Sequence, residues 1–206
     1  MRVVCISDTH ERHAAIGVPE GDVLICAGDV TANGNPVALE RFARWMSRQP
    51  HAHKILVAGN HDWCFERDAR ALLPPDIIYL QDSATAIDGL RVWGSPWQPR
   101  FCDWAFNLDR GPQLAAKWAL IPADTDILVT HGPPFGTLDL TPRGDRAGCE
   151  ALAARLEHLP RVRLHVFGHI HHGYGTVERD GRISVNASIC DESYRASNAP
   201  VVVELN

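Results

Sequence analysis

Short apolar runs recur along the chain, and each ends abruptly in a polar turn. The runs are three or four residues long and rich in Val, Ile or Leu. They cover residues 3–6, 23–26, 55–57, 127–129 and 164–167. Continuous runs of this length are typical of strands that are buried on both faces by covering layers. The pattern therefore predicts buried sheet strands that come from distant parts of the sequence.

Helical patterns separate some of these runs. Asn35 followed by Pro36 has the signature of a helix N-cap with proline at the first helical position. The face that this helix buries is predicted to contain Leu39, Phe42, Ala43 and Met46. A second helix is expected to start where Gly111 precedes Pro112. A third has an apolar stripe that Pro160 ends, and the stripe consists of Cys149, Leu152, Leu156 and Leu159.

The last third of the chain has a different pattern. Residues 173–178 and 182–187 are joined through Arg-Asp-Gly at 179–181, which is typical of a β-hairpin, and residues 200–205 supply a final strand. Short strands are also expected within residues 77–93. Residues 94–112 are rich in Trp, Pro and Phe but have no period, which predicts a long ordered loop. With no repeat or linker in the sequence, we expect one domain over residues 1–206.

Composition narrows the class of protein. The 206 residues carry a net charge of −5, and no run of Lys or Arg is present, which argues against a general nucleic-acid binder. No stretch approaches the length of a membrane span, and the first apolar run is too short for a signal-peptide core. The six cysteines are scattered and form no CxxC pair, so reduced thiols are expected. We therefore expect a cytoplasmic protein with no membrane partner, whereas its oligomeric state is left open.

Side chains that bind metals follow the five apolar runs. The sequences there are DTH at 8–10, GD at 28–29, GNHD at 59–62, THGPP at 130–134 and GHIH at 168–171. Asp, Asn and His are ligands for divalent metals, and in layered α/β folds ligands bind beyond the carboxyl ends of the strands. The two-residue spacing of Asp8 and His10, and of His169 and His171, would point each pair the same way in extended backbone.

This ordered set of motifs resembles the calcineurin-like metallophosphoesterase superfamily over residues 5–171. Further segments resemble the metallophosphoesterase-domain-containing proteins within it: WGSPWQP at 93–99, THGPP, GHIHHGYG at 168–175 and NAS at 186–188. The resemblance implies an α/β fold, a four-layer α-β-β-α sandwich of two packed mixed sheets flanked by helices. It also implies a dinuclear metal site.

The ligand set and the residue roles are implied by the same resemblance. Asp8, His10 and His171 would hold one ion, whereas Asn60, His131 and His169 would hold the other. Asp29 would bridge both ions. His61 would stay off the metals and face the substrate as the catalytic histidine, and Asp62 is expected to orient it. The ions would be Mn, Fe, Zn or Ni, because His, Asp and Asn ligands suit all four metals. Mn is favoured for activity.

Metal-activated hydroxide would attack the phosphorus of a small phosphoester or nucleotide, and His61 would stabilise the transition state or protonate the leaving oxygen. The narrower resemblance favours phosphodiesters such as cyclic nucleotides. A phosphomonoesterase or nucleotidase would need the same metals, and a nucleotide-binding protein with weak catalysis is a further alternative. The acidic balance disfavours a DNA nuclease, so no long nucleic acid is expected as a partner.

Several residues near the motifs have two interpretations. His13 and His172 adjoin motifs, and Arg12, Arg100 and Arg143 carry charges that suit phosphate, but solvated loop positions are the simpler interpretation for all five. A base could stack on the aromatic cluster of the 94–112 loop, although such residues more often pack the loop onto its domain. This cluster consists of Trp97, Phe101, Trp104 and Phe106.

Overall fold

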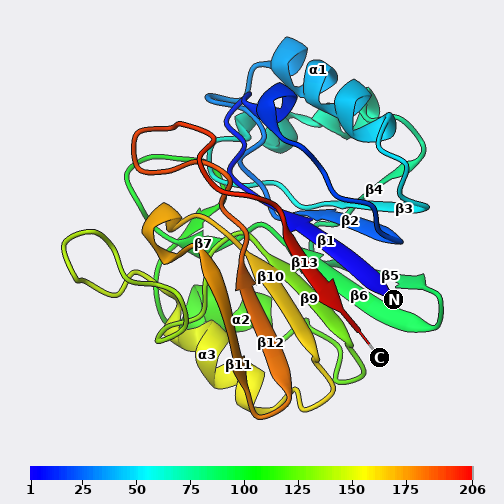
Figure 1. Cartoon of the computed structure of the whole chain (residues 1–206). Coiled ribbons are helices and arrows are strands. Elements are labelled where there is room, and N and C mark those ends of the chain that lie inside the picture. The colour runs from blue at the N-terminus through cyan, green and yellow to red at the C-terminus, as the bar shows by residue number, and fades with distance from the viewer. Residues whose placement is uncertain (206) are drawn as a thin grey trace.

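The first sheet has five strands and carries the N-terminal half of the chain. The computed structural model describes residues 1–205. The strand order is β13-β1-β2-β3-β4, in which β1 to β4 run parallel and β13 is the antiparallel edge (Figure 1). These strands are β1 (Arg2–Ile6), β2 (Val23–Cys26), β3 (His53–Leu56), β4 (Ile77–Tyr79) and β13 (Val201–Glu204).

The second sheet has six strands in the order β11-β12-β10-β9-β6-β5. Its centre is parallel and both edges close with antiparallel hairpins. Its strands are β5 (Ser83–Ile87), β6 (Leu90–Ser95), β9 (Ile127–Thr130), β10 (Leu164–Phe167), β11 (Gly175–Arg179) and β12 (Arg182–Asn186). A separate parallel pair joins β7 (Gln98–Pro99) to β8 (Asn107–Leu108).

Three apolar clusters separate four layers. Val4 on β1 packs with α1 (Pro36–Ser47), whereas its neighbour Val3 faces the second sheet. On β9, Val129 faces the first sheet, whereas Leu128 packs with α2 (Pro112–Trp118) and α3 (Glu150–Glu157). Adjacent residues of a strand thus fill opposite faces, as buried strands require. Figure 1 shows α1 above the two sheets and α3 below them, and the expected α-β-β-α sandwich is confirmed.

Most predicted elements lie where the sequence pattern placed them. The strands expected at 23–26 and 164–167 are confirmed at both ends, and the Asn35 side chain accepts a hydrogen bond from the backbone N–H of Val37 as the predicted N-cap. The third strand starts earlier than its apolar run, because it includes His53 and Lys54. The 94–112 loop also carries β7 and β8, two-residue strands too short to leave a periodic signal.

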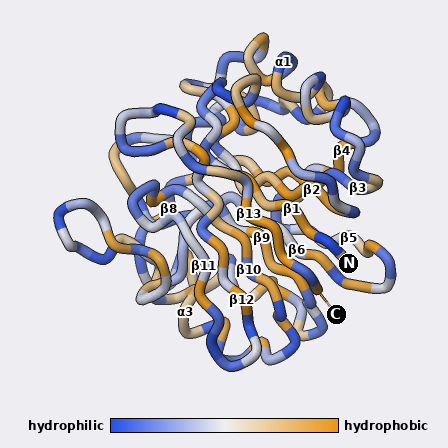
Figure 2. Tube along the Cα trace, viewed as in Figure 1, coloured by the Kyte–Doolittle hydropathy of each residue, from blue (hydrophilic) through white to orange (hydrophobic). Residues whose placement is uncertain are grey.

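Hydrophobic residues are concentrated in the middle of the molecule. Figure 2 shows β1, β13, β9 and β10 in hydrophobic colours, while the loops around them are largely hydrophilic. Within the described residues, no helix is both long enough and apolar enough to cross a membrane. The parallel strands of both sheets end at a common edge, where the loops after β1, β2, β3, β9 and β10 meet. This edge positions the polar motifs.

Candidate metal centre

Backbone hydrogen bonds hold the loops after β1 and β2 against each other. The backbone N–H of Asp8 donates to the carbonyl of Gly28 at 2.9 Å, and that of His10 donates to the carbonyl of Asp29 at 2.9 Å. The backbone N–H of Gly168 in turn donates to the carbonyl of His131, also at 2.9 Å. Within each sheet, main-chain hydrogen bonds therefore hold neighbouring motifs together.

The backbone conformation that aims these side chains differs from the prediction. Asp8, His10, Asp29 and His169 all have left-handed backbone, with φ between 39° and 66°. The extended backbone expected for residues 8–10 and 169–171 is therefore wrong, although the paired side chains do converge. Left-handed residues turn the chain sharply, and Asp adopts this conformation more readily than most residues because its side chain can hydrogen-bond locally.

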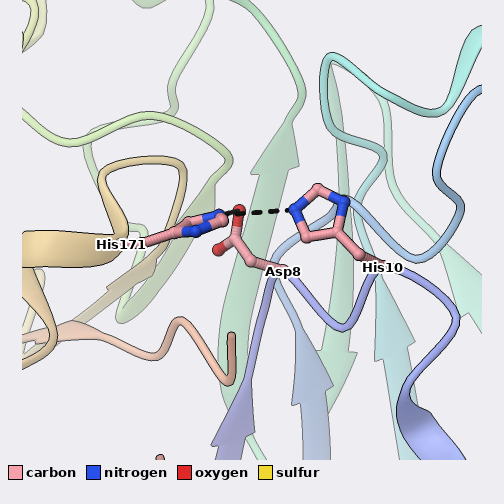
Figure 3. Close-up of side chains that lie close together, drawn as sticks. All are labelled: Asp8, His10 and His171. Carbon is pink, nitrogen blue, oxygen red and sulfur yellow. Dashed lines mark hydrogen bonds and ion pairs between the residues drawn. The ribbon is translucent and has the colours of Figure 1, made fainter. Parts of the chain in front are cut away.

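A first group of ligand atoms comes from Asp8, His10 and His171, residues that are far apart in sequence (Figure 3). The Nε2 atoms of His10 and His171 lie 3.3 Å apart, and Nε2 of His171 is 3.4 Å from Oδ1 of Asp8. Ligand atoms bound about 2.0–2.2 Å from one ion lie roughly 3–3.5 Å from one another. The observed spacing matches that of atoms that share an ion.

A second group of ligand atoms comes from Asp29, His131 and His169. Nε2 of His131 lies 3.4 Å from Oδ1 of Asp29 and 2.9 Å from Oδ1 of Asn60. Asn60 and His131 are both buried. The residues predicted for the second ion are thus together.

Asp29 lies between the two groups and offers each a different oxygen. Its Oδ1 faces His131 at 3.4 Å, whereas its Oδ2 lies 3.7 Å from Nε2 of His10. The backbone N–H of His61 donates to Oδ1 at 2.8 Å, which helps to fix the carboxylate plane. A carboxylate placed in this way can bind two ions at once.

Backbone carbonyls set the tautomers of the histidines. The Nδ1 atom of His131 lies 2.9 Å from the carbonyl of Ala27, and that of His171 lies 3.0 Å from the carbonyl of Asp191. A carbonyl oxygen only accepts, so each Nδ1 carries a proton and each neutral ring turns the Nε2 lone pair toward the carboxylates. An Nε2 lone pair and a carboxylate oxygen repel each other when no proton lies between them. A cation bound between the two atoms removes that repulsion. The donor set therefore fits metal ions.

Protons are drawn into the same sites when no metal is bound. Burial alone would raise the pKa of Asp8, but a hydrogen bond from His171 and its charge hold that pKa well below its usual range. Burial lowers the pKa of His131, yet Asp29 outweighs it and raises that pKa to about 9. Burial lowers the pKa of His10 to about 4, against the opposing effect of Asp29. Negative charge in the centre thus attracts cations.

Two glycines leave room for the carboxylates. A Cβ atom on Gly59 would lie 2.2 Å from Oδ1 of Asp29, and one on Gly168 would lie 2.0 Å from Oδ2 of Asp8. Both distances are well inside van der Waals contact. The motif glycines are therefore required because ligands from other loops occupy the space of a side chain.

His61 stands beside the two groups and faces the cavity. Its Nδ1 lies 2.7 Å from the carbonyl of Ala32, so Nδ1 carries a proton, and its Nε2 lies 3.9 Å from Oδ2 of Asp29. Its ring stacks on that of Trp104, with centroids 4.1 Å apart. These contacts fix the ring with Nε2 available to a substrate.

Asp62 was expected to orient His61, and its carboxylate is buried beside the motif. Its carboxylate accepts hydrogen bonds from the backbone N–H groups of Val30, Thr31 and Gly59, and from the hydroxyl of Thr31. Ala32 and Trp104 hold the imidazole instead. A buried carboxylate must satisfy its oxygens, and the donors that reach Asp62 are main-chain N–H groups and the Thr31 hydroxyl. Asp62 holds the loops in place rather than the ring.

The residues around the two groups enclose a cavity of about 560 Å³. Of the residues with two interpretations, Phe101, Arg100 and Arg143 line it. Trp97 instead donates a hydrogen bond to Asp82, and Phe106 is buried in the core. These two residues pack the loop.

Three further residues near the motifs lie away from the cavity. His13 is buried against Phe42 and Trp45, whereas Arg12 and His172 are exposed. None of them is among the described residues that line the cavity. The interpretation as solvated loop positions is confirmed for Arg12 and His172 but is wrong for His13, which packs in the core beside α1.

One loop of the site could not be predicted from sequence patterns. Asp191 binds His171 through its carbonyl oxygen, and the ring of Tyr194 lies 4.8 Å from that of His10. A contact through a main-chain carbonyl does not depend on residue type, so the sequence does not reveal it. A single Tyr in a polar segment forms no recognisable motif. Ser188, which lies in a motif that carried the family resemblance, donates its hydroxyl to Oδ2 of Asp8 at 2.8 Å.

Several known proteins are similar to this chain in sequence. A sequence profile described as calcineurin-like phosphoesterase matches residues 1–173. The human and mouse proteins named metallophosphoesterase domain-containing protein 1 are each 43% identical to the chain over 230 residues, covering 99% of this chain and 71% of each relative. A Synechococcus protein named "Probable cyclic nucleotide phosphodiesterase" is 27% identical over 156 residues, covering 74% of this chain and 59% of that protein.

Proposed function

This chain belongs to the calcineurin-like phosphoesterase family, and from that premise we propose that it hydrolyses phosphoesters with two divalent metal ions. The observation that carries the proposal is the position of Asp29, whose two oxygens face two separate groups of ligand atoms. The proposed ligands of one ion are Asp8, His10 and His171, and those of the other are Asn60, His131 and His169. Asp29 bridges them.

Charge favours an anionic substrate at this centre. Two divalent ions carry four positive charges, whereas the proposed ligands include only two carboxylates, Asp8 and Asp29. Neutral imidazoles and the Asn60 amide offset none of the remainder. A phosphate group bound there neutralises the excess charge in a partly buried site, where electrostatic attraction is stronger than in water.

The ions would supply a nucleophilic oxygen at neutral pH and neutralise charge on the phosphoryl group. The chain itself contributes orientation and proton transfer. Asp8 is held by the backbone N–H of His169 and the hydroxyl of Ser188. His61, fixed by Ala32 and Trp104, presents its Nε2 edge to the substrate, where it would stabilise the transition state or pass a proton to the oxygen of the leaving alcohol.

We propose small phosphodiesters as the preferred substrates, with manganese as the most active metal. The size of the cavity supports this, since it falls in the range of pockets that enclose drug-sized ligands. Similarity to the Synechococcus protein, whose name specifies a cyclic nucleotide phosphodiesterase, supports it as well. Within the proposal, residues 1–206 form one metallophosphoesterase domain that acts in the cytoplasm, and the free cysteines fit a reducing compartment.

A substrate panel tests the proposal. Metal-free protein is loaded with manganese, zinc, iron or nickel and assayed with bis(p-nitrophenyl) phosphate, p-nitrophenyl phosphate, cyclic AMP and AMP. We expect diesters to be hydrolysed faster than monoesters, chelator to abolish both activities, and His61→Asn to reduce both. Faster monoester hydrolysis would identify a phosphomonoesterase or nucleotidase. Nucleotide binding without hydrolysis by any metal form would overturn the proposal.

A further inference from the structure

A tight turn near the C-terminus projects Tyr194 toward the metal centre. The side chain of Asp191 accepts hydrogen bonds from the backbone N–H groups of Ser193 and Arg195, and it also pairs with the Arg195 guanidinium. The backbone N–H of Tyr194 donates to the Asp191 carbonyl. The same carbonyl accepts the Nδ1 proton of His171. The turn is therefore cross-braced and tied to a proposed ligand.

The backbone of Tyr194 is in an unfavourable conformation. Its φ is 56°, in the left-handed region that Gly and Asn adopt more readily than an aromatic residue does. A residue that served only to make the turn would be expected to be Gly or Asn. Unfavourable backbone of this kind is concentrated at functional sites, where the surrounding structure holds it in place.

The Tyr194 ring meets three histidines of the centre. It lies nearly perpendicular to the rings of His10 and His171, with centroids 4.8 and 5.6 Å away, and 6.2 Å from that of His61. Edge-to-face contacts at these distances are favourable for aromatic rings. Despite them, 46% of Tyr194 remains exposed. The exposed part borders the cavity, whose other apolar lining includes Phe101 and Ile170.

We propose that Tyr194 is a specificity-determining residue that contacts the ester substituent of the substrate and favours flat, aromatic substituents. The inference rests on the proposed function and adds to it the chemical class of the substituent. A phosphate group bound between the two ligand groups fills only part of a 560 Å³ cavity, which leaves room beside Tyr194 for the attached group. Tyr194 offers that group an aromatic surface next to the reacting phosphorus.

Ring contact predicts a preference that a merely structural tyrosine would not produce. A flat ring gains offset or edge-on contact with Tyr194, whereas a saturated ring of similar size cannot approach as closely. The gain from one aromatic pair corresponds to about a 3- to 10-fold difference in affinity. Phenylphosphonate and cyclohexylphosphonate carry the same charged group, are not hydrolysed, and differ in the shape of the substituent.

The experiment measures the dissociation constants of both phosphonates for the manganese-loaded full chain by calorimetry. The variants are Tyr194→Phe, which keeps the ring, and Tyr194→Asn, which suits left-handed backbone without a ring. Tyr194→Gly repeats the second test should Asn impair folding. Phe135→Asn is the matched control, because Phe135 is 43% exposed and lies outside the cavity lining. Thermal unfolding of the metal-free proteins checks that each variant folds.

We expect wild type, Tyr194→Phe and Phe135→Asn to bind phenylphosphonate about 3- to 10-fold more tightly than cyclohexylphosphonate. In Tyr194→Asn this ratio is expected to fall to near one. A wild-type ratio near one, no binding of either phosphonate, or an unchanged ratio in Tyr194→Asn and Tyr194→Gly overturns the inference. Failure of the proposed function is a separate result, namely hydrolysis of no phosphoester, because the binding ratio needs no turnover.

Discussion

Replacing Gly168 by alanine is the substitution whose effect on the centre follows most directly from the distances. The added Cβ would lie 2.0 Å from Oδ2 of Asp8 and 2.2 Å from Oγ of Ser7, both buried on another segment. Restoring the 3.4 Å of ordinary van der Waals contact requires the carboxylate to retreat by about 1.4 Å. A proposed metal ligand cannot move this far and keep its place.

The loss of stability follows from the hydrogen bonds that Asp8 loses when it moves. Its carboxylate accepts hydrogen bonds from the backbone N–H of His169 and the hydroxyl of Ser188. Hydrogen bonds to a charged group contribute about 1.5–3 kcal/mol each, so loss of both is expected to make unfolding about 3–6 kcal/mol easier. Misplacing a reacting group by about 1 Å lowers rates roughly 100-fold, and we expect at least that loss here.

Urea unfolding and metal analysis of Gly168→Ala test this expectation. Gly132→Ala is the control, since its Cβ would meet only Gln98, at 3.2 Å, although Gly132 adjoins His131. Should Gly168→Ala fold poorly, Asp8→Ala in the same chain removes the clash with Asp8 and leaves only that with Ser7, so the double variant should be more stable than the sum of the single effects implies. Full metal content and unchanged stability in Gly168→Ala would refute the argument.

Further predictions concern the histidine, the buried carboxylate, pH and metal removal. His61→Asn is expected to lower turnover about 100- to 10,000-fold with metal content unchanged; steady-state kinetics with elemental analysis checks this, and joint loss of metal and activity would contradict the role of His61. Asp62→Asn sets an amide donor against backbone N–H donors, so unfolding should become about 3 kcal/mol easier in urea; an effect below about 1 kcal/mol would show that Asp62 does not hold the loops. Burial lowers the pKa of His165 from its ordinary value of about 6.5 to about 3. Between these two pH values the unfolded chain binds a proton that the folded chain does not, so the free energy of unfolding falls as pH drops below about 6.5. In metal-free protein this group should make unfolding about 2 kcal/mol easier at pH 5 than at pH 8, and His165→Gln should remove that part of the slope; identical slopes would contradict it. Chelation should lower stability by about 3 kcal/mol for each site held at 100 times its Kd, measured by urea unfolding with and without manganese; coincident curves would mean that metal does not bind the folded state preferentially.

Local sequence patterns predicted the buried strands and the convergence of the motifs, whereas the four-layer sandwich was implied by the family resemblance. Buried parallel strands are continuous apolar runs, so 23–26 and 164–167 could be recognised without any alignment. The N-cap at Asn35 is equally local. Residues that follow parallel strands must share one sheet edge, which is why the metal-binding side chains could be grouped before their contacts were known.

Tertiary contacts explain what the sequence could not supply. The left-handed backbone at Asp8 and His169 depends on loops that press against each other across the sheet edge. The partners of Asp62 include main-chain groups of its own turn and of the loop after β2, which no residue pattern records. Tyr194 reaches the centre because a braced turn aims it there, and its sequence neighbours give no indication of this.

The number of metal ions bound to wild type and to Asp29→Asn tests the central claim most directly. Both proteins are saturated with manganese, freed of excess metal and analysed for metal per chain. Because each oxygen of Asp29 faces a different ligand group, the account predicts two ions per wild-type chain and weakened binding of both in Asp29→Asn. One ion or none in wild type, or two equally tight ions in the variant, would contradict it.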